Sequence, residues 1–487
     1  MNRLWRRGDR RDDGQAIWLG LGVGVAGLMV GALLGFGGPL IAVGALLALA
    51  AALWALTNLE VGLWGTIVII TLLPFAALPF KIVFTPNFVD LTLLSVVLVY
   101  ALQWMTGRRR RLRLTPAHGP LAVFLALTVF SFVAGMPNGP LTTNLIRQFG
   151  ELLLNMALIF IIVDYVDRPE RLTRLVRVII LGGTGAAALG IGLYLLPVDL
   201  SERLLSALGI FGYPAGGVLR YIEDNPENAQ RAISTSVDPN FLGGMLAMLG
   251  GLLAPQLLTQ RPVLWNRWLT AAAFAVVMAC LVLTFSRGAM AGLGLAVLGI
   301  ALARYRRLLW VVLAAALVIL VLPATRDYVT HFIEGVRGDD LATQMRLGEY
   351  KDAFILISRY PLLGVGFAGA PEIDIYLGVS SAYLLIAEQM GLVGLAAFLV
   401  VIASVLVWAF RQRHAVYAAG DRVGAGLPEQ WLGLLAGLVA ALAVGVVDHY
   451  FFKLSFQSAG TLFWLYVGLL LAATRLGAEA GGGGEEA

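Results

Sequence analysis

Residues 381–410 read SAYLLIAEQMGLVGLAAFLVVIASVLVWAF, a run in which Glu388 is the only charged side chain. A membrane-spanning helix needs about 20 consecutive apolar residues, so this run is long enough to cross a bilayer. Strands of an outer-membrane barrel would instead appear as short segments of alternating polarity. The unbroken run therefore predicts a helix that spans a membrane.

The whole chain, like this run, is rich in apolar residues and poor in charged ones. Of its 487 residues, 59% are hydrophobic and only 13% are charged, whereas a soluble domain carries roughly 25% charged residues. So little polar surface excludes a soluble enzyme, a disordered protein and a nucleic-acid binder. The composition predicts an all-α, polytopic integral membrane protein, with the lipid bilayer as its surroundings and no nucleic acid as a partner.

The apolar runs predict about 12–14 transmembrane helices, which together form a single transmembrane domain over residues 1–487. We place these runs at 17–36, 38–57, 61–79, 88–106, 119–135, 149–165, 174–196, 238–259, 267–285, 289–303, 307–324, 381–410, 429–447 and 456–475.

Arginine clusters predict the orientation of these helices, because cytoplasmic loops carry an excess of basic residues. With the N-terminus inside, all seven arginine clusters fall on the cytoplasmic side. They are Arg3–Arg11, Arg108–Arg113, Arg168–Arg177, Arg261/Arg267, Arg304–Arg307, Arg411–Arg422 and Arg475. Both termini are then cytoplasmic, and residues 476–487, which include Gly-Gly-Gly-Gly-Glu-Glu, are predicted to form a disordered tail.

The same topology leaves two long extracytoplasmic loops, residues 197–237 and 325–380. Loops longer than about 12–15 residues are usually functional or disordered, and neither loop has the composition of a linker. Asp340–Tyr360 reads as an amphipathic helix in the second loop, ended by Pro361. A period of 3.6 residues places one set of side chains on its common face: Arg346, Glu349, Tyr350, Ala353 and Ile357.

Nine arginines lie outside in this topology, where orientation does not explain them: Arg147, Arg203, Arg220, Arg231, Arg287, Arg326, Arg337, Arg346 and Arg359. A guanidinium group binds phosphate in a bidentate manner, so such a cluster suits a diphosphate. The alternative is that most of them lie among lipid headgroups or pair with neighbouring acids: Asp224, Glu227, Asp339, Glu349 and Asp352. Arg287 stands out because it lies between two apolar runs, where a charge is costly unless it is paired or used.

Other polar groups have simpler explanations. Glu388 lies inside the 381–410 run and could be a hydrogen-bond partner of another helix, for example of Arg287. Asp448 and His449 end a span beside aromatic residues 450–452, as in an interfacial aromatic belt. A single cysteine, Cys280, and four histidines give no ligand cluster, so we expect no metal site and no cofactor.

Three stretches together resemble the O-antigen ligase / O-antigen polymerase (Wzy-type) superfamily of membrane glycosyltransferases. The resemblance covers residues 231–395. The stretches are Arg231-Ala-Ile-Ser-Thr-Ser-Val-Asp238-Pro239-Asn240, then Leu283-Thr-Phe-Ser-Arg287-Gly288, and then the helix with Arg346 followed by Tyr360-Pro-Leu-Leu-Gly364-Val-Gly366, Ala382-Tyr383-Leu-Leu and Glu388-Gln-Met-Gly391-Leu-Val-Gly394.

The resemblance implies an all-helical glycosyltransferase of class C in a bacterial inner membrane, with its active site on the extracytoplasmic face. Such an enzyme transfers glycan from a polyprenyl-diphosphate-linked oligosaccharide donor to a glycan or lipid-glycan acceptor, without metal or nucleotide. Arg231, Arg287 and Arg346 match the arginines that hold the donor diphosphate. The further substrate-binding candidates are Arg220, Asn240, Tyr383, Glu388 and His449.

One departure from the family pattern concerns the acceptor. Ligases of this family carry a His-Asn or similar pair just before the Tyr-Leu of the span that follows the loop, and the histidine is proposed to activate the acceptor hydroxyl. Here Ser380-Ser381 stands in that place, which favours a polymerase over a ligase. The groups that could act instead are His331, His449, Asp374 and Asp448.

Two further functions remain open. A transporter or flippase for a lipid-linked glycan or anionic solute would use the arginines to line a path, and it would usually show broken helices in repeated halves. A structural subunit of an assembly complex would need no chemistry. The arginines collect near the outer edge rather than in mid-span, which favours the glycosyltransferase.

Overall fold

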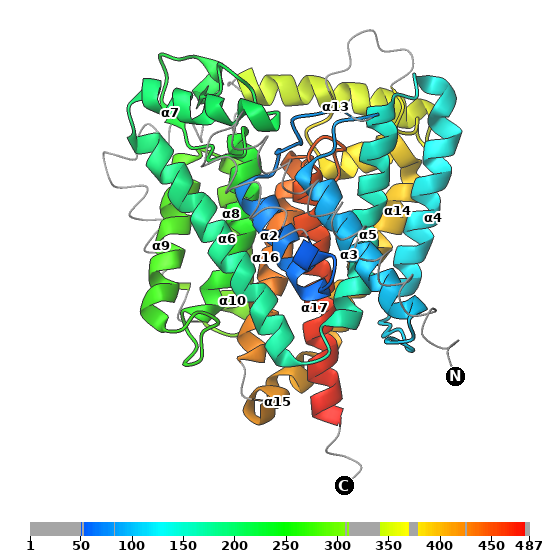
Figure 1. Cartoon of the computed structure of the whole chain (residues 1–487), viewed down its shortest axis with the longest axis vertical. Helices are drawn as coiled ribbons and strands as arrows, with labels where there is room; N and C mark the ends of the chain where they lie inside the picture. Colours follow the sequence, from blue (N-terminus) through cyan, green and yellow to red (C-terminus); the bar gives the residue numbers. More distant parts are fainter. Residues whose placement is uncertain are drawn as a thin grey trace, which may run out of the picture. The chain divides into compact units, whose positions relative to one another are not determined.

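The computed structural model describes residue 50, residues 53–306 apart from residue 82, and residues 309–310, 341–369, 378–423 and 426–482. The chain divides into two compact units, Met1–Gly62 and Leu63–Ala487. Within the second unit, the described residues form a bundle of α-helices, in which Figure 1 follows the order of the elements.

The predicted apolar runs that fall on described residues correspond to helices. These helices are α2 (Leu59–Leu72), α3 (Phe88–Met105), α4 (His118–Gly135), α5 (Thr143–Tyr165), α6 (Pro169–Leu195), α8 (Pro239–Gln256), α9 (Arg267–Leu283), α10 (Arg287–Ala303), α14 (Ala382–Arg411), α16 (Leu427–Val447) and α17 (Gln457–Gly482). Seven helices in the described part of the chain are long and apolar enough to cross a membrane. The fold is therefore the predicted all-α, polytopic membrane fold. The run 17–36, and most of the runs 38–57 and 307–324, lie outside the described residues.

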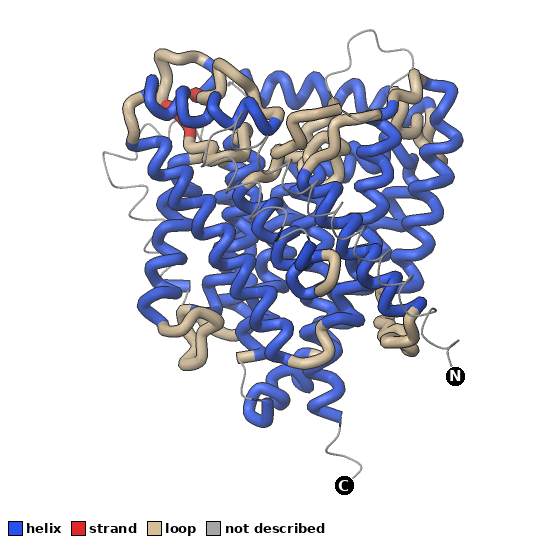
Figure 2. The backbone as a smooth tube through the Cα atoms, viewed as in Figure 1, coloured by secondary structure: helices blue, strands red, loops and turns tan. Residues whose placement is uncertain are grey.

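The remaining elements lie between the long helices. They are α7 (Val198–Ser206), α13 (Leu341–Arg359), α15 (Arg413–Val423), the 3-10 helices η1 (Met136–Asn138), η2 (Ala207–Phe211) and η3 (Ile222–Asp224), and the antiparallel strands β1 (Arg220–Tyr221) and β2 (Gln230–Arg231). Figure 2 shows both strands at one end of the bundle. The described residues 341–359 confirm the helix expected over 340–360. At the C-terminus, α17 takes in residues 476–482 of the segment expected to form a tail.

Helix α17 lies at the centre of the bundle. The residues of its apolar stretch are all buried, whereas only 22% of those in α3 are buried. Helix α17 packs against α5, α15 and α16. Two polar groups of α5 and α17 meet inside this contact, because the hydroxyl of Thr461 donates to Asn155 Oδ1 (2.6 Å) and Asn155 Nδ2 donates to Gln457 Oε1 (2.8 Å). These satisfied polar groups fix the register of the two helices.

Glycines let α8, α10 and α16 approach one another closely. A Cβ on Gly437 would lie 2.7 Å from the carbonyl oxygen of Met248, and one on Gly433 would lie 2.5 Å from that of Leu252. The Gly-x-x-x-Gly spacing of α16 is the small-residue pattern by which membrane helices pack. Gly243 of α8 has the same role towards Ser286, the residue before α10. The start of α10 is thereby held against α8.

Helix α14 is broken at Gly391, and the segment that follows α13 fills the break. Gly391 has φ 70° and ψ −178°, a conformation that only glycine adopts readily. The backbone N–H of Val365 donates to the carbonyl of Glu388 (2.8 Å), and that of Gly366 donates to the carbonyl of Gln389 (2.9 Å). The Pro361–Gly366 segment therefore satisfies the carbonyls that the break leaves without a helical partner.

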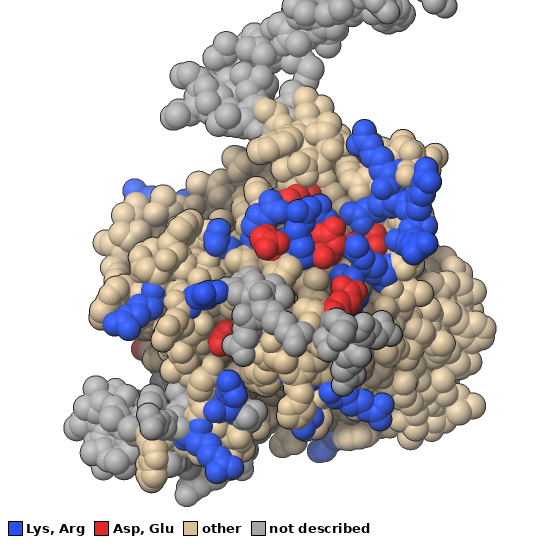
Figure 3. All heavy atoms as spheres, turned by 90° about the horizontal axis from the view of Figure 1, so that it is seen from below, with Lys and Arg blue, Asp and Glu red and all other residues tan. Residues whose placement is uncertain are grey.

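Arginines gather at the end of the bundle where α15 and the end of α17 lie (Figures 1 and 3). Asp164, at the end of α5, forms an ion pair with Arg109 and accepts from the hydroxyl of Tyr100 (3.1 Å). Arg475 of α17 donates to the carbonyl of Val166 (2.7 Å). Several charges of this end are thus paired with groups of neighbouring helices.

Candidate functional site

Arg287 is the first residue of α10 and follows a tight turn after α9. Within this turn Phe285 has φ 51°, in the left-handed region that is unusual for a bulky residue. The hydroxyl of Thr284 accepts from the backbone N–H of Ser286 (3.2 Å). Because backbone strain of this kind collects at functional sites, the turn that carries Arg287 is a candidate site on geometry as well as on charge.

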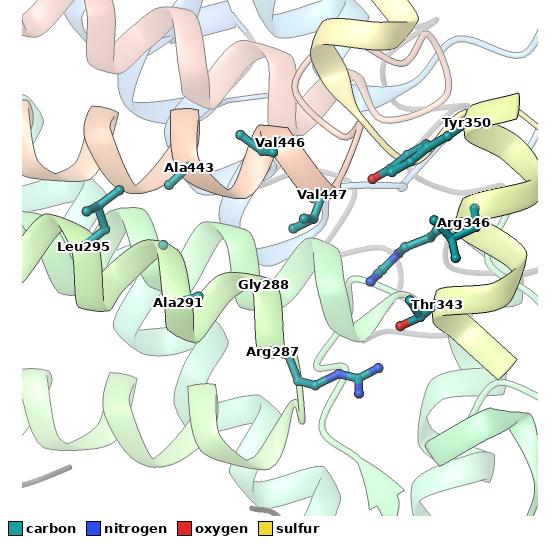
Figure 4. A pocket seen from close by; sticks show the side chains of 12 residues that line it. Arg287, Gly288, Ala291, Leu295, Thr343, Arg346, Tyr350, Ala443, Val446 and Val447 are labelled. Atoms are coloured by element: carbon teal, nitrogen blue, oxygen red, sulfur yellow. The ribbon is translucent and has the colours of Figure 1, made fainter. Parts of the chain in front are cut away.

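A cavity of about 560 Å³ opens beside Arg287. It is bounded by α10, α13 and α16, and Figure 4 shows it from close by. The residues that line it are Arg287, Gly288, Ala291, Gly292, Leu295, Thr343, Arg346, Leu347, Tyr350, Ala443, Val446 and Val447. One end carries the two arginines with Thr343 and Tyr350, and the rest is apolar wall from α10 and α16. The lining of the cavity is therefore amphipathic, with one polar, positively charged end and an apolar remainder, as in many ligand-binding sites.

Arg287 and Arg346 project into the same space from different helices (Figure 4). Both side chains are half-buried, so their charges are less screened than at an open surface. The helix dipole of α10, whose positive end lies at Arg287, adds to the positive electrostatic potential of the two side chains. An anionic group with several oxygens, such as a diphosphate, would be bound by both guanidinium groups.

Arg231, predicted to hold the diphosphate with them, does not line this cavity. Its Nε donates to the carbonyl of Thr284 (2.8 Å) and its Nη2 donates to Asn240 Oδ1 (2.6 Å). Arg231 therefore joins β2 and the start of α8 to the turn that precedes Arg287. Asn240, a predicted substrate-binding residue, is its partner in this contact.

The structure also places three other candidates away from the cavity lining. Arg220 donates to the carbonyl of Val237 (3.4 Å) and lies 3.9 Å from an Asp224 oxygen. The hydroxyl of Tyr383 donates to the carbonyl of Leu442 (2.9 Å) and so links α14 to α16. Glu388 is 2% exposed, next to the break in α14.

The alternative explanation of ion pairing holds for some outer arginines. Arg147 contacts Asp90 (2.7 Å) and Glu151 (3.3 Å), and Arg220 contacts Asp224 as above. Arg203 is exposed on α7. Arg326 and Arg337 lie outside the described residues, as do His331 and Asp374. No group of three histidine, cysteine, aspartate or glutamate residues with the geometry of a metal site occurs among the residues that the structure describes.

A polar cluster adjoins the arginine end of the cavity, where α16 ends at Val447. The carbonyl of Asp448 accepts from the backbone N–H of Ala382 (2.8 Å), directly after Ser380-Ser381. The hydroxyl of Tyr350 donates to the carbonyl of Ser380 (3.1 Å), and Glu349 Oε2 accepts from the N–H of Ser380 (2.9 Å). The segment expected to hold a histidine thus packs against α13 and Asp448.

Burial gives the two titratable groups of this cluster opposite properties. Burial, with the neighbouring Asp238 charge as second cause, raises the pKa of Asp448 to about 8. Burial, together with the charges of Lys453 and Arg346, lowers the pKa of His449 to about 3. His449 is therefore a neutral imidazole at physiological pH. Its Nδ1 is buried and has no hydrogen-bond partner among the described residues.

Sequence reasoning did not single out Thr343, Tyr350 or Lys453 as site residues. Thr343 and Tyr350 lie one helical turn on either side of Arg346, so the 3.6-residue period places them on the face of Arg346. Lys453 follows α16 and its charge acts on both Asp448 and His449. Its only signal in the sequence is that lysine occurs at three positions in the chain.

Comparison with known proteins gives a family match over part of the chain. Residues 271–399 match the family model described as O-antigen ligase, a stretch that includes Arg287, Arg346 and the break of α14. A search among curated proteins finds no significant match. The match supports a role in membrane glycan processing of the O-antigen ligase or polymerase type. Over residues 271–399, the resemblance to the O-antigen ligase / O-antigen polymerase superfamily is therefore confirmed.

Proposed function

We propose that the protein transfers glycan from a polyprenyl-diphosphate-linked donor to an acceptor sugar on the extracytoplasmic face of a bacterial inner membrane, and that it acts as a polymerase rather than a ligase. The observation that carries the proposal is the single cavity into which Arg287 and Arg346 both project, and which continues as an apolar wall along α10 and α16. A polyprenyl diphosphate has an anionic diphosphate, which suits the two arginines, and a long apolar chain, which suits the apolar wall.

The chemistry follows from this arrangement. When the acceptor oxygen bonds to the anomeric carbon of the donor sugar, the bond from that carbon to the diphosphate oxygen breaks, and negative charge develops on the diphosphate. Guanidinium groups fixed beside that oxygen stabilise the transition state more than the ground state. Arg287 and Arg346 have this role. Arg231 holds the turn from which Arg287 projects.

The placement on the membrane rests on the distribution of charge. Arg109, Arg113, Arg171 and Arg475 form ion pairs at the end of the bundle opposite α13. Since basic residues collect on the cytoplasmic side, that end faces the cytoplasm, together with the end of α17. The cavity beside α13 then opens at the extracytoplasmic side.

The apolar wall is expected to bind the first isoprene units of the donor. Ala443 lines it, so Ala443→Trp would displace the chain. Loss of two buried methylene groups, at about 0.8 kcal/mol each, lowers affinity about tenfold. We expect KM for a long polyprenyl donor to rise at least about tenfold, and KM for a short donor, in which a methyl group replaces the polyprenyl chain, to change far less.

Ala396→Trp is the matched control, because Ala396 is exposed on α14 and does not line the cavity. Equal loss of affinity for short and long donors in Ala443→Trp would contradict the proposed place of the lipid chain. So would an equal effect of Ala396→Trp.

The length of the product tests the activity itself. Purified protein would be incubated with a polyprenyl-diphosphate oligosaccharide, and the glycans separated by size. A ladder of products is the result expected for a polymerase. A single addition would indicate a ligase. An unchanged donor that has crossed a vesicle membrane would indicate the alternative function, a transporter or flippase.

A further inference from the structure

Asp448, at the end of α16, is an acid in surroundings that disfavour its ionised form. Asp448 is only 7% exposed and directly follows the last residue of a long helix, where the helix dipole disfavours negative charge. A second acid, Asp238, is close enough for its charge to act on Asp448. Burial, the dipole and the second acid all oppose ionisation. An acid kept under such conditions is a candidate for a functional group.

The two carboxyl groups differ in their partners. Asp238 Oδ1 accepts from the N–H groups of Asn240 (2.7 Å) and Phe241 (3.0 Å), and from the hydroxyl of Tyr450 (2.9 Å). These three bonds occupy Oδ1 of Asp238, which is the N-cap of α8. Asp448 has one such bond in this cluster, from the N–H of His449 (2.8 Å). Two carboxyl groups in such different surroundings take different roles in acid–base chemistry.

Asp448 also lies beside the proposed donor site. It follows Val447, which lines the cavity. The charge of Arg346 acts on Asp448, and the charge of Asp448 acts on Tyr350, and both of these partners line the cavity as well. The end of the cavity that holds the donor diphosphate is therefore the end at which Asp448 is found.

We infer that the Asp448 carboxylate is the general base that accepts the proton of the acceptor hydroxyl. The inference rests on the proposed function. The acceptor O–H bond breaks, its proton passes to Asp448, and the oxygen bonds to the anomeric carbon. The bond from that carbon to the diphosphate breaks, and its electron pair leaves with the diphosphate, which Arg287 and Arg346 bind.

The neighbouring His449 is the other group that could take this proton. Its imidazole has a pKa lowered to about 3, so its drive to accept a proton at neutral pH is small. The pKa of Asp448 is raised to about 8, which is close to the pH at which a general base works best. His449 is therefore neutral, and its Nδ1 is buried with no hydrogen-bond partner among the described residues.

The charged and titratable groups around Asp448 come from three elements. Asp238 belongs to the start of α8, Arg346, Glu349 and Tyr350 belong to α13, and His449, Tyr450 and Lys453 belong to the segment after α16. A base must be ionised to act, so the transfer rate is expected to rise as pH passes the pKa of Asp448. Between pH 7 and pH 9 this gives an increase of about tenfold.

The experiment measures transfer rates of the purified protein in lipid nanodiscs between pH 6 and pH 9.5, with a polyprenyl-diphosphate oligosaccharide as donor. Asp448→Asn keeps the shape of the side chain. It is expected to lower the rate at least about 100-fold, to abolish the rise with pH, and to leave donor binding within twofold of the native value. Asp448→Glu is expected to restore part of the rate and the pH dependence.

Two variants serve for comparison. Asp199→Asn removes an exposed acid of α7 and is expected to behave as the native protein. His449→Gln is expected to keep the rise with pH. If Asp448→Asn kept that rise, or if His449→Gln lost it, the assignment to Asp448 would be wrong while the proposed function stood. Failure of the native protein to transfer glycan at any pH would contradict the proposed function, and the assignment with it.

Discussion

Arg287→Ala is expected to lower the rate of glycan transfer by about 10²–10³ while leaving the amount of folded protein unchanged. Loss of one fixed group that stabilises charge in a transition state has an effect of this size, about 3–4 kcal/mol. Arg287 projects into the cavity beside Arg346, where the proposed function places the departing diphosphate. The measurement is kcat/KM with a polyprenyl-diphosphate oligosaccharide.

The type of charge is part of this expectation. Arg287→Lys keeps the charge but loses the planar fork that binds two phosphate oxygens at once, so only part of the activity should return. Arg203→Ala is the matched control, because Arg203 is an exposed arginine of α7 outside the cavity lining. Activity of Arg287→Ala within a few-fold of the native protein would exclude Arg287 from the chemistry.

Gly391→Ala is expected to have the largest effect on folding. The residue has φ 70° and ψ −178°, which costs a residue with a side chain about 1–3 kcal/mol. A Cβ there would also overlap the carbonyl oxygen of Leu362. The Pro361–Gly366 segment would be displaced from the break of α14, and its hydrogen bonds to Glu388 and Gln389 would be lost. We expect at least about 3 kcal/mol of destabilisation.

The loss should appear as a lower thermal midpoint of the protein in detergent and a lower yield of monodisperse protein. Gly294→Ala is the control, because a Cβ on Gly294 of α10 meets no atom within 4 Å. Alanine has the higher helix propensity, so this variant should be as stable as the native protein or slightly more stable. Equal midpoints for the two variants would contradict the structural role given to the break.

The helices were predictable because a membrane span is a local property of composition. The run 119–135 became α4 (His118–Gly135) almost residue for residue. The run expected at 149 starts at Thr143 instead, because Arg147 continues the helix by pairing with acids of α3 and α5. The break at Gly391 was not predicted, because it depends on a tertiary contact. The carbonyls of Glu388 and Gln389 accept hydrogen bonds from the Pro361–Gly366 segment, which is distant in the sequence.

The candidate site was predictable only in part, because it also depends on tertiary contacts. Arg287 and Arg346 were named from their position outside the spans, and the structure brings them to one cavity. Arg231 and Tyr383 were named on the same resemblance, yet they donate hydrogen bonds to Thr284, Asn240 and Leu442 within the protein. Sequence identifies the type of side chain, whereas tertiary partners decide which atoms face a substrate.

The proposed general base, Asp448, also could not be identified from the sequence alone. His449 and Asp448 are neighbours in the sequence and were equal candidates there. The surroundings of each side chain separate them, because burial makes the histidine a weak base and the aspartate a stronger one.

The most direct test of the central claim follows the diphosphate. Purified protein in vesicles would receive a polyprenyl-diphosphate oligosaccharide, and the released polyprenyl diphosphate would be measured against new glycosidic bonds. The account predicts that the two appear in equal amounts in the native protein and that both form about 10²–10³ times more slowly in Arg287→Ala. A donor that crosses the vesicle membrane intact, with no diphosphate released, would contradict it.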